Sequence, residues 1–218
     1  MRAVAWSQTL TSLPKERKPD VVAQQATTDD DAVRKQAELN TEWELVRRAQ
    51  SFDNDAIHQL YEKYFPKIYN YAFMQMGDVQ AAEDLASDVM LKMIESINKY
   101  TFRGLPFGAW VFRIARNRLI DLHRRRKRRG EVDLSETLST ALANPQALAE
   151  RALERGQLQI ALKHLTEEQR QVIVLKFIEG FDNRSVGRIM GRSEGAIKSL
   201  QHRALGALRR IIHPEDRY

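Results

Sequence analysis

Residues 181–200 read FDNRSVGRIMGRSEGAIKSL, and this stretch carries the strongest local signal in the chain. Val186 and Met190 would lie on the buried side of a short helix. Gly191 then permits a tight turn, and Ser193 is a favourable N-cap for a second helix. A short helix, a glycine turn and a capped second helix are the layout of a helix-turn-helix.

The second helix of this motif, predicted over 193–212, has two chemically different faces. At about 100° per residue, one arc is apolar and holds Ile197, Leu200, Ala204, Leu208 and Ile211. The opposite arc is polar and basic, with Lys198, Ser199, His202 and Arg203, and Arg192 stands in the turn before it. One anchored face and one face of donors are what a helix needs to read the major groove of DNA. The same pattern also fits an ordinary surface helix with a solvated cationic face.

The composition favours an all-α protein. The chain has 218 residues with only ten Gly and six Pro, which suits helices better than a turn-rich β sandwich. It has no Cys, which excludes disulfides, thiolate nucleophiles and cysteine zinc sites and fits a reducing compartment. We therefore expect a helical, cytoplasmic protein.

The hydrophobic pattern predicts two helical domains joined by a linker. Residues 1–40 have few large apolar side chains after Leu13, so we expect them to be disordered. No stretch approaches about 18 uninterrupted apolar residues, and we expect no membrane insertion. The predicted order is that extension, a four-helix domain over 41–129, a flexible acidic linker over 130–149, a four-helix domain with the helix-turn-helix over 150–212, and a tail over 213–218.

Cap and breaker residues predict where individual helices begin and end. Asp53 or Asn54 can cap a helix in the first domain, and Pro66 should kink or end that helix. In the second domain, Thr166 is the expected N-cap of a helix that Gly180 stops.

The net charge of +6 is concentrated in two places. Residues 116–129 carry eight basic and one acidic side chain, and residues 182–210 carry seven basic and two acidic ones. Residues 130–181, between them, have a net charge of −3. Two separated basic patches predict two contacts with a polyanion, joined by a segment that stays off it.

The helix predicted over 107–129 contains the first basic patch. Trp110 and Asn117 share one stripe, and the helix continues into a basic end that includes Arg124 and Arg125. An aromatic ring beside an amide can stack an unpaired base and bind its edge, while the basic end holds phosphates. The alternative is that Trp110 belongs to the core, Asn117 is a satisfied polar residue, and the basic run is solvated.

The amphipathic helix predicted over 79–100 has an acidic stripe that contains Asp84 and Asp88. Leu85 and Leu91 lie at the edges of this polar side, where a purely solvated face would not place them. Exposed leucines beside acidic residues predict a docking site for helices of another protein. The alternative is two scattered surface leucines.

We find no pattern for catalysis, metal binding or cofactor binding. The chain lacks a glycine-rich phosphate loop, and its five His show no metal-ligand spacing. The carboxylates follow helical surface patterns, for which structural roles are the simpler interpretation.

Three segments together resemble the bacterial extracytoplasmic-function (ECF) sigma factors of the sigma-70 family. They are AEDLASDV at 82–89, FGAWVFRIARN at 107–117, and LTEEQR at 165–170, which leads into the helix-turn-helix. The resemblance covers about residues 42 to 212, and it implies initiation of transcription on promoters by RNA polymerase.

The resemblance also implies roles for individual residues. Those expected to bind the clamp helices of the largest polymerase subunit are Asp84, Leu85, Asp88 and Leu91. Those expected at the minus-ten element, including a flipped base, are Phe102, Trp110, Asn117, Arg124 and Arg125. Those expected at the minus-thirty-five element are Arg192, Lys198, Ser199, His202 and Arg203. An anti-sigma factor is a further expected partner.

A rival interpretation is a stand-alone helix-turn-helix regulator with an unrelated helical sensor domain. It predicts tight operator binding without polymerase, usually as a dimer, and leaves the segment from Trp110 to Asn117 unexplained. An RNA-processing or nucleotide enzyme is a poorer option because no catalytic residues stand out. For the sigma factor, we expect weak DNA binding by the free protein, with its domains correctly spaced only on core polymerase.

Overall fold

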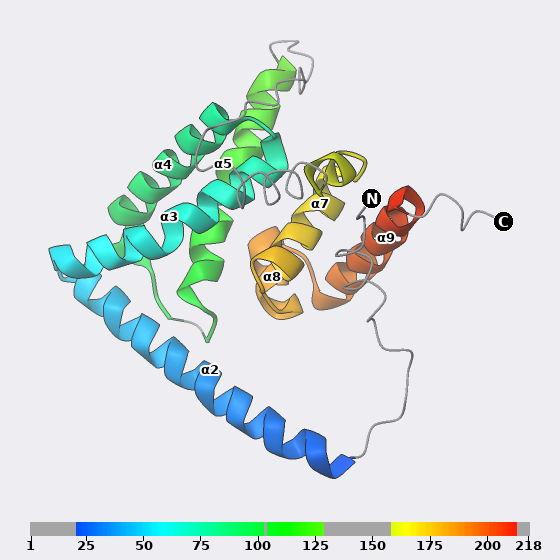
Figure 1. Ribbon diagram of the computed structural model, residues 1–218. Helices are drawn as coiled ribbons and strands as arrows, with labels where there is room; N and C mark the ends of the chain where they lie inside the picture. Colours follow the sequence, from blue (N-terminus) through cyan, green and yellow to red (C-terminus); the bar gives the residue numbers. More distant parts are fainter. Residues whose placement is uncertain (1–20, 103, 129–157, 213–218) are drawn as a thin grey trace, which may run out of the picture. The chain divides into compact units, whose positions relative to one another are not determined.

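The computed structural model describes residues 21–102, 104–128 and 158–212. Every regular element in these ranges is helical, which confirms the all-α prediction (Figure 1). The chain divides into two compact units, residues 1–41 and residues 42–218. The predicted linker at 130–149 and the tail at 213–218 lie outside the described residues.

The first described helix, α2 (Val21–Gln50), corrects the prediction of a disordered segment over residues 21–40. The side chains described between 36 and 41 are almost all exposed, so burial does not explain this part of the helix. Residues 21–40 contain four Ala and three Gln, which have high intrinsic helix propensity. The prediction of disorder rested on the scarcity of large apolar side chains, which does not prevent a helix from forming.

The N-terminal helical group consists of α2 from Glu42 onward, α3 (Asn54–Met76), α4 (Val79–Ser96) and α5 (Phe107–Arg128). Asp53 caps α3, because its side chain accepts hydrogen bonds from the backbone N–H groups of residues 55 and 56. Gly77 ends α3 in the left-handed conformation, with φ of 74°. Asp78 then caps α4, so the two helices are joined by a turn of only two residues.

Helix α3 passes through Pro66 without ending, so of the two predicted alternatives, a kink or a helix end, the helix end is wrong. A proline inside a helix removes one backbone hydrogen bond. Leu60 and Tyr64 before it, and Ile68 and Tyr71 after it, are all buried in the same core. Packing on both sides of the proline therefore holds the helix together across it.

The C-terminal helical group consists of a helical segment over 158–163, α7 (Glu167–Ile173), a π-helical turn η2 (Val174–Ile178), α8 (Asn183–Met190) and α9 (Glu194–Ile212). Thr166 caps α7 in a capping box with Gln169, as predicted. Gly180 follows the end of η2 with φ of 75°.

Helices α8 and α9 form the predicted helix-turn-helix. Gly191 ends α8 with φ of 65°, and the hydroxyl of Ser193 accepts a hydrogen bond from the backbone N–H of Ala196 in α9. The turn also depends on Gly187, where an added Cβ would lie 2.8 Å from the carbonyl oxygen of Arg192. No side chain fits there without moving backbone, so the turn needs a glycine inside α8 as well as at its end.

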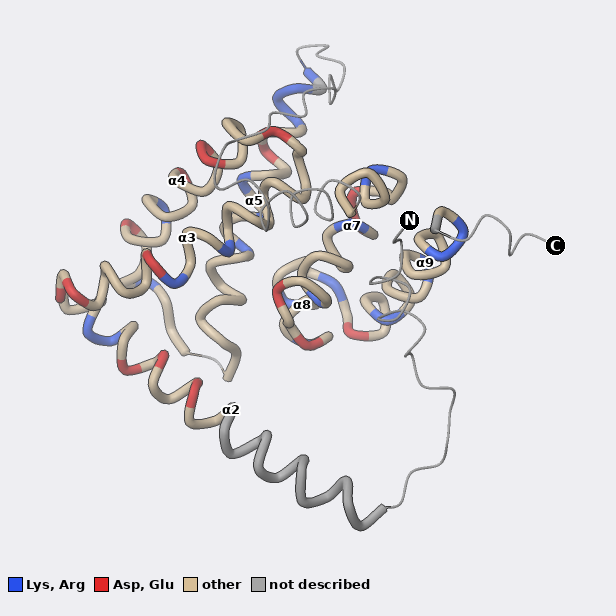
Figure 2. The backbone as a smooth tube through the Cα atoms, in the orientation of Figure 1, with Lys and Arg blue, Asp and Glu red and all other residues tan. Residues whose placement is uncertain are grey.

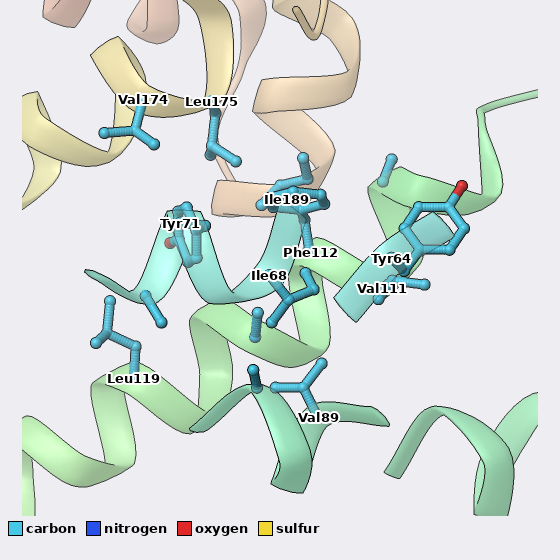
Figure 3. Close-up of a cluster of buried hydrophobic side chains, with 14 of the residues drawn as sticks. Tyr64, Ile68, Tyr71, Val89, Val111, Phe112, Leu119, Val174, Leu175 and Ile189 are labelled. Atoms are coloured by element: carbon cyan, nitrogen blue, oxygen red, sulfur yellow. The ribbon is translucent and has the colours of Figure 1, made fainter. Parts of the chain in front are cut away.

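One continuous core joins the two helical groups within residues 42–218. Figure 3 shows Ile189 of α8 beside Phe112 of α5, and Leu175 of η2 beside Tyr71 of α3. The ring of Phe112 also packs edge-on against Tyr71, with centroids 5.5 Å apart. The helix-turn-helix is thus packed onto the helix that carries the first basic patch.

Candidate nucleic-acid interface

The exposed face of α9 has the composition predicted for a DNA-reading helix. The anchoring residues Ile197, Leu200 and Ala204 are buried, with exposures of 0%, 7% and 0%. The polar residues predicted opposite them are all exposed, namely Lys198, Ser199, His202 and Arg203. The structure therefore brings all four together on one solvent-facing side of the helix.

Arg192 is exposed in the turn before α9, and it pairs with the carboxylate of Glu168 near the start of α7. This ion pair holds the guanidinium at the entrance to the exposed face of α9. A phosphate contact by Arg192 would require this ion pair to break. Breaking it takes little free energy, because both side chains are about half exposed.

Asn117 and Trp110 occupy different environments on α5. Asn117 is exposed, which rules out a buried, satisfied amide at this position. Trp110 is partly buried, with its ring 5.2 Å from that of Tyr100 and 5.2 Å from that of Phe107. The indole therefore belongs to an aromatic cluster and still presents part of its surface to solvent.

The two basic patches lie at the end of α5 and on α9, where Figure 2 shows Lys and Arg in blue. Arg124 and Arg125 are both exposed near the end of α5. No group of three His, Asp or Glu that could hold a metal ion occurs among the described residues. In the same residues, no helix combines membrane-spanning length with sufficient apolar character.

The loop between α4 and α5 presents Phe102, which is 37% exposed. Its ring rests on Trp43 of α2, with the ring centroids 5.6 Å apart. Tyr100, at the start of the loop, packs edge-on against Phe107, and burial raises the pKa of its phenol to about 12. Gln50 of α2 donates hydrogen bonds to the carbonyl oxygens of Ile97 and Tyr100, at 2.9 and 2.8 Å.

Sequence reasoning missed Glu42, which is 8% exposed and accepts three hydrogen bonds. One carboxylate oxygen accepts from Lys63 Nζ at 2.6 Å and from the hydroxyl of Tyr64 at 2.5 Å. The other accepts from the backbone N–H of Phe107, the first residue of α5, at 2.9 Å. Burial, and then the neighbouring carboxylate, raise the pKa of Tyr64. The sequence does contain one indication that α5 is capped from elsewhere in the chain. Pro106 precedes the helix, and a proline side chain has no acceptor for the first backbone N–H groups.

The predicted docking face on α4 needs one correction. Asp84 and Asp88 are exposed, and Leu91 is 59% exposed, as expected. Leu85 is only 1% exposed, so its predicted position on the surface is wrong. Leu85 lies four residues before the buried Val89, so the two side chains share one side of α4. The buried side of the helix therefore includes Leu85.

Ile94 is a second exposed apolar residue on α4. It is 39% exposed and lies three residues after Leu91, so the two are neighbours on the helix surface. Asp88 lies 3.6 Å from the guanidinium of Arg118 on α5. The exposed face therefore combines two carboxylates with two aliphatic side chains.

Polar contacts join the two helical groups beside their shared core. Arg116 of α5 donates to the side-chain oxygen of Gln171 of α7 at 3.0 Å. His123 lies 3.4 Å from the carboxylate of Glu167, and a hydrogen bond with this imidazole lowers the pKa of Glu167. Arg116 and His123 lie on a different stripe of α5 from Trp110 and Asn117. The contacts with α7 therefore leave the candidate nucleic-acid surface of α5 free of this packing.

Family models match both helical groups. The model of sigma-70 region 2 matches residues 60–129, and the model of sigma-70 region 4 matches residues 161–210. The first range contains α4 and α5, and the second contains the complete helix-turn-helix.

The chain is also similar to known sigma factors. BldN of Streptomyces coelicolor, an ECF RNA polymerase sigma factor, is 35% identical over 175 residues, which are 79% of this chain and 66% of BldN. ShbA of Streptomyces griseus subsp. griseus, another ECF RNA polymerase sigma factor, is 32% identical over 177 residues, which are 77% of this chain and 93% of ShbA.

A solved structure agrees with these relatives. The sigma factor RpoE of Bartonella quintana, solved in complex with the anti-sigma factor NepR, has 27% sequence identity and a TM-score of 0.60. The match covers 71% of this chain and 95% of that one. With both regions present in this order and with these relatives, the chain belongs to the ECF sigma factors of the sigma-70 family.

Proposed function

We propose that this sigma factor directs core RNA polymerase to promoters by reading the minus-ten and minus-thirty-five elements, and that it starts DNA melting. The proposal rests on the separation of apolar and polar residues between the two faces of α9. Ile197, Leu200 and Ala204 are buried, while the four polar positions opposite them are exposed. A helix of this kind can enter the major groove without losing its anchoring contacts.

The minus-ten element is read by the surface formed by Phe102, Trp110 and Asn117. The two aromatic rings offer apolar faces for an unpaired base, and the amide of Asn117 has donors and an acceptor for its edge. Arg124 and Arg125 lie further along α5 and hold the phosphate backbone. Support for this assignment comes from the exposure of Asn117 and the partial exposure of both rings.

The minus-thirty-five element is read by Lys198, Ser199, His202 and Arg203, with Arg192 at the entrance. Lysine and arginine supply hydrogen bonds to guanine edges and to phosphates, and serine can bond to either kind of base edge. These contacts release counterions, so binding falls steeply as the salt concentration rises.

The face of α4 with Asp84, Asp88 and Leu91 binds the clamp helices of the largest polymerase subunit. Its two carboxylates and its exposed leucine suit a partner helix with basic and apolar side chains. Leu85 supports this face from the buried side and makes no direct contact with the partner.

An anti-sigma factor holds the protein inactive in the cytoplasm, where core polymerase is present. Support comes from RpoE, a structural relative with 27% identity that was solved with its anti-sigma factor NepR. Because the two helical groups share one core within residues 42–218, such a partner could bind both groups at once.

Run-off transcription of genomic DNA with purified core polymerase, with and without this protein, tests the proposal. We expect new transcripts with defined start sites that depend on the protein. The alternative of a stand-alone regulator predicts tight binding to a palindromic operator without polymerase and no new start sites. That second result would exclude the proposed function.

A further inference from the structure

The carboxylate of Glu42 caps a helix that begins 65 residues later in the chain. The first N–H groups of an α-helix have no partner within the helix and usually bond to a side chain just before it. The residue before α5 is Pro106, which has no side-chain acceptor. Glu42 accepts the N–H of Phe107 in its place, and its charge also favours the positive end of the helix.

The same segment of α2 holds the other parts of the loop at 100–106. Gln50 fixes the beginning of the loop through the carbonyl oxygens of Ile97 and Tyr100. Trp43 packs against Phe102 in the loop, at 5.6 Å between centroids. Three side chains of α2 therefore hold the beginning, the middle and the end of the loop.

The loop and the first turn of α5 carry two of the residues assigned to the minus-ten element. Phe102 contacts Trp43 directly, and Trp110 is linked to Trp43 through the ring of Tyr100. A change at α2 would therefore alter the positions of both rings.

We propose that Glu42, with Trp43 and Gln50, forms a brace that sets the geometry of the minus-ten reading loop. The inference rests on the proposed function, since it assigns positioning residues to that same site. The brace touches neither DNA nor polymerase. It fixes the distance and angle between Phe102 and Trp110, so that both can engage the same unpaired strand.

Glu42→Gln is the test variant because it keeps the size of the side chain and removes the charge and one acceptor oxygen. Glu44→Gln is the matched control, since Glu44 is exposed on the same helix and its only described partner in an ion pair is Arg47, at 3.8 Å. A third variant combines Glu42→Gln with Pro106→Asp, which supplies a local acceptor and a negative charge at the start of α5.

Hydrogen exchange tests the brace without DNA. We expect Glu42→Gln to speed exchange of the backbone amides of residues 100–102, 104, 105 and 107 by about tenfold, because the cap of α5 is weakened. The amides in α4 should not change, and Glu44→Gln should match the wild type. Unchanged exchange in the loop would overturn the inference, even if the proposed function were correct.

Binding of the polymerase complex to DNA tests the functional part, with start sites mapped by run-off transcription. The probes are a fork template with a single-stranded minus-ten strand and a duplex with only the minus-thirty-five element. For Glu42→Gln we expect about tenfold weaker fork binding, with core binding and duplex binding within about twofold of wild type. Pro106→Asp should restore part of the loss.

The outcomes separate the inference from the function on which it rests. If Glu42→Gln weakens core, duplex and fork binding equally, Glu42 is a general stabiliser and the brace is wrong. If the wild-type protein yields no start sites, the proposed function fails, while the exchange experiment still decides whether Glu42 holds the loop.

Discussion

The ring of Phe181 meets the ring of Phe112 edge-on, with the centroids 5.0 Å apart and the planes at 75°. Phe112 belongs to α5, and Phe181 lies between η2 and α8, so this contact joins the two helical groups. Edge-to-face aromatic pairs contribute beyond the apolar area that they bury. The contact therefore has an energy that a double-mutant cycle can measure.

We expect Phe112→Ala to lower the free energy of unfolding by about 3 to 5 kcal/mol, because Phe112 is 1% exposed. Phe181→Ala should cost less, since Phe181 is only partly buried. The double variant should show a coupling of about 0.5 to 1.5 kcal/mol in denaturant titrations. Strict additivity of the two losses would mean that the rings do not interact in solution.

Leu85 and Leu91 should respond in opposite ways to truncation. Leu85→Ala should lower the free energy of unfolding by about 2 to 5 kcal/mol, because Leu85 is 1% exposed. Leu91→Ala should change stability by no more than about 0.5 kcal/mol, yet weaken binding to core polymerase, because Leu91 is 59% exposed. Thermal unfolding and a core-binding titration of both variants check this, and normal core binding by Leu91→Ala would contradict the docking assignment.

Phe52 is a position where a smaller residue should stabilise the fold. It has a positive φ of 62°, is 73% exposed and follows the end of α2, where glycine is the favoured residue. We expect Phe52→Gly to raise the free energy of unfolding by roughly 0.5 to 1 kcal/mol. Phe52→Ala retains the strain and is the control, and equal stability of the two variants would show that the strain is negligible.

Asn117→Ala should separate promoter opening from promoter binding. An amide that holds an unpaired base acts only after the strands separate, so open-complex formation should fall by about tenfold or more while closed-complex binding stays near that of wild type. Permanganate footprinting and a mobility-shift titration measure the two steps. An equal loss in both would indicate a structural role for Asn117.

Tyr100 should stay protonated at a pH where ordinary tyrosines ionise. Its pKa is raised to about 12, mainly by burial, so the folded state favours the neutral phenol. The contribution of this group to stability is complete below pH 10 and is lost as the pH rises from about 10 to 12. NMR titration of the ring should give a pKa near 12, and Tyr100→Phe should remove this contribution to the alkaline loss of stability.

Local signals in the sequence were enough to predict most of the helices and the exposed polar face of α9. The caps at Thr166 and Ser193 act within three residues along the chain, and the period of α9 alone separates its two faces. These features need no knowledge of what packs against them.

The remaining features depend on contacts between distant residues. Pro66 would end an isolated helix, and only the core on both sides keeps α3 continuous. The burial of Leu85 depends on how much of α4 its neighbours cover. Glu42 looked like one of many surface carboxylates, because its partners lie 21, 22 and 65 residues away.

The long separation between Glu42 and Phe107 also bears on how the protein is made. A ribosome synthesises the acceptor first, so α5 leaves the exit tunnel with its cap already present in the chain. Closing so long a loop is slow compared with forming a local cap. We therefore predict that α5 docks onto α2 late in the folding of this group of helices, and a chain interrupted before residue 107 leaves Glu42 without one of its three partners.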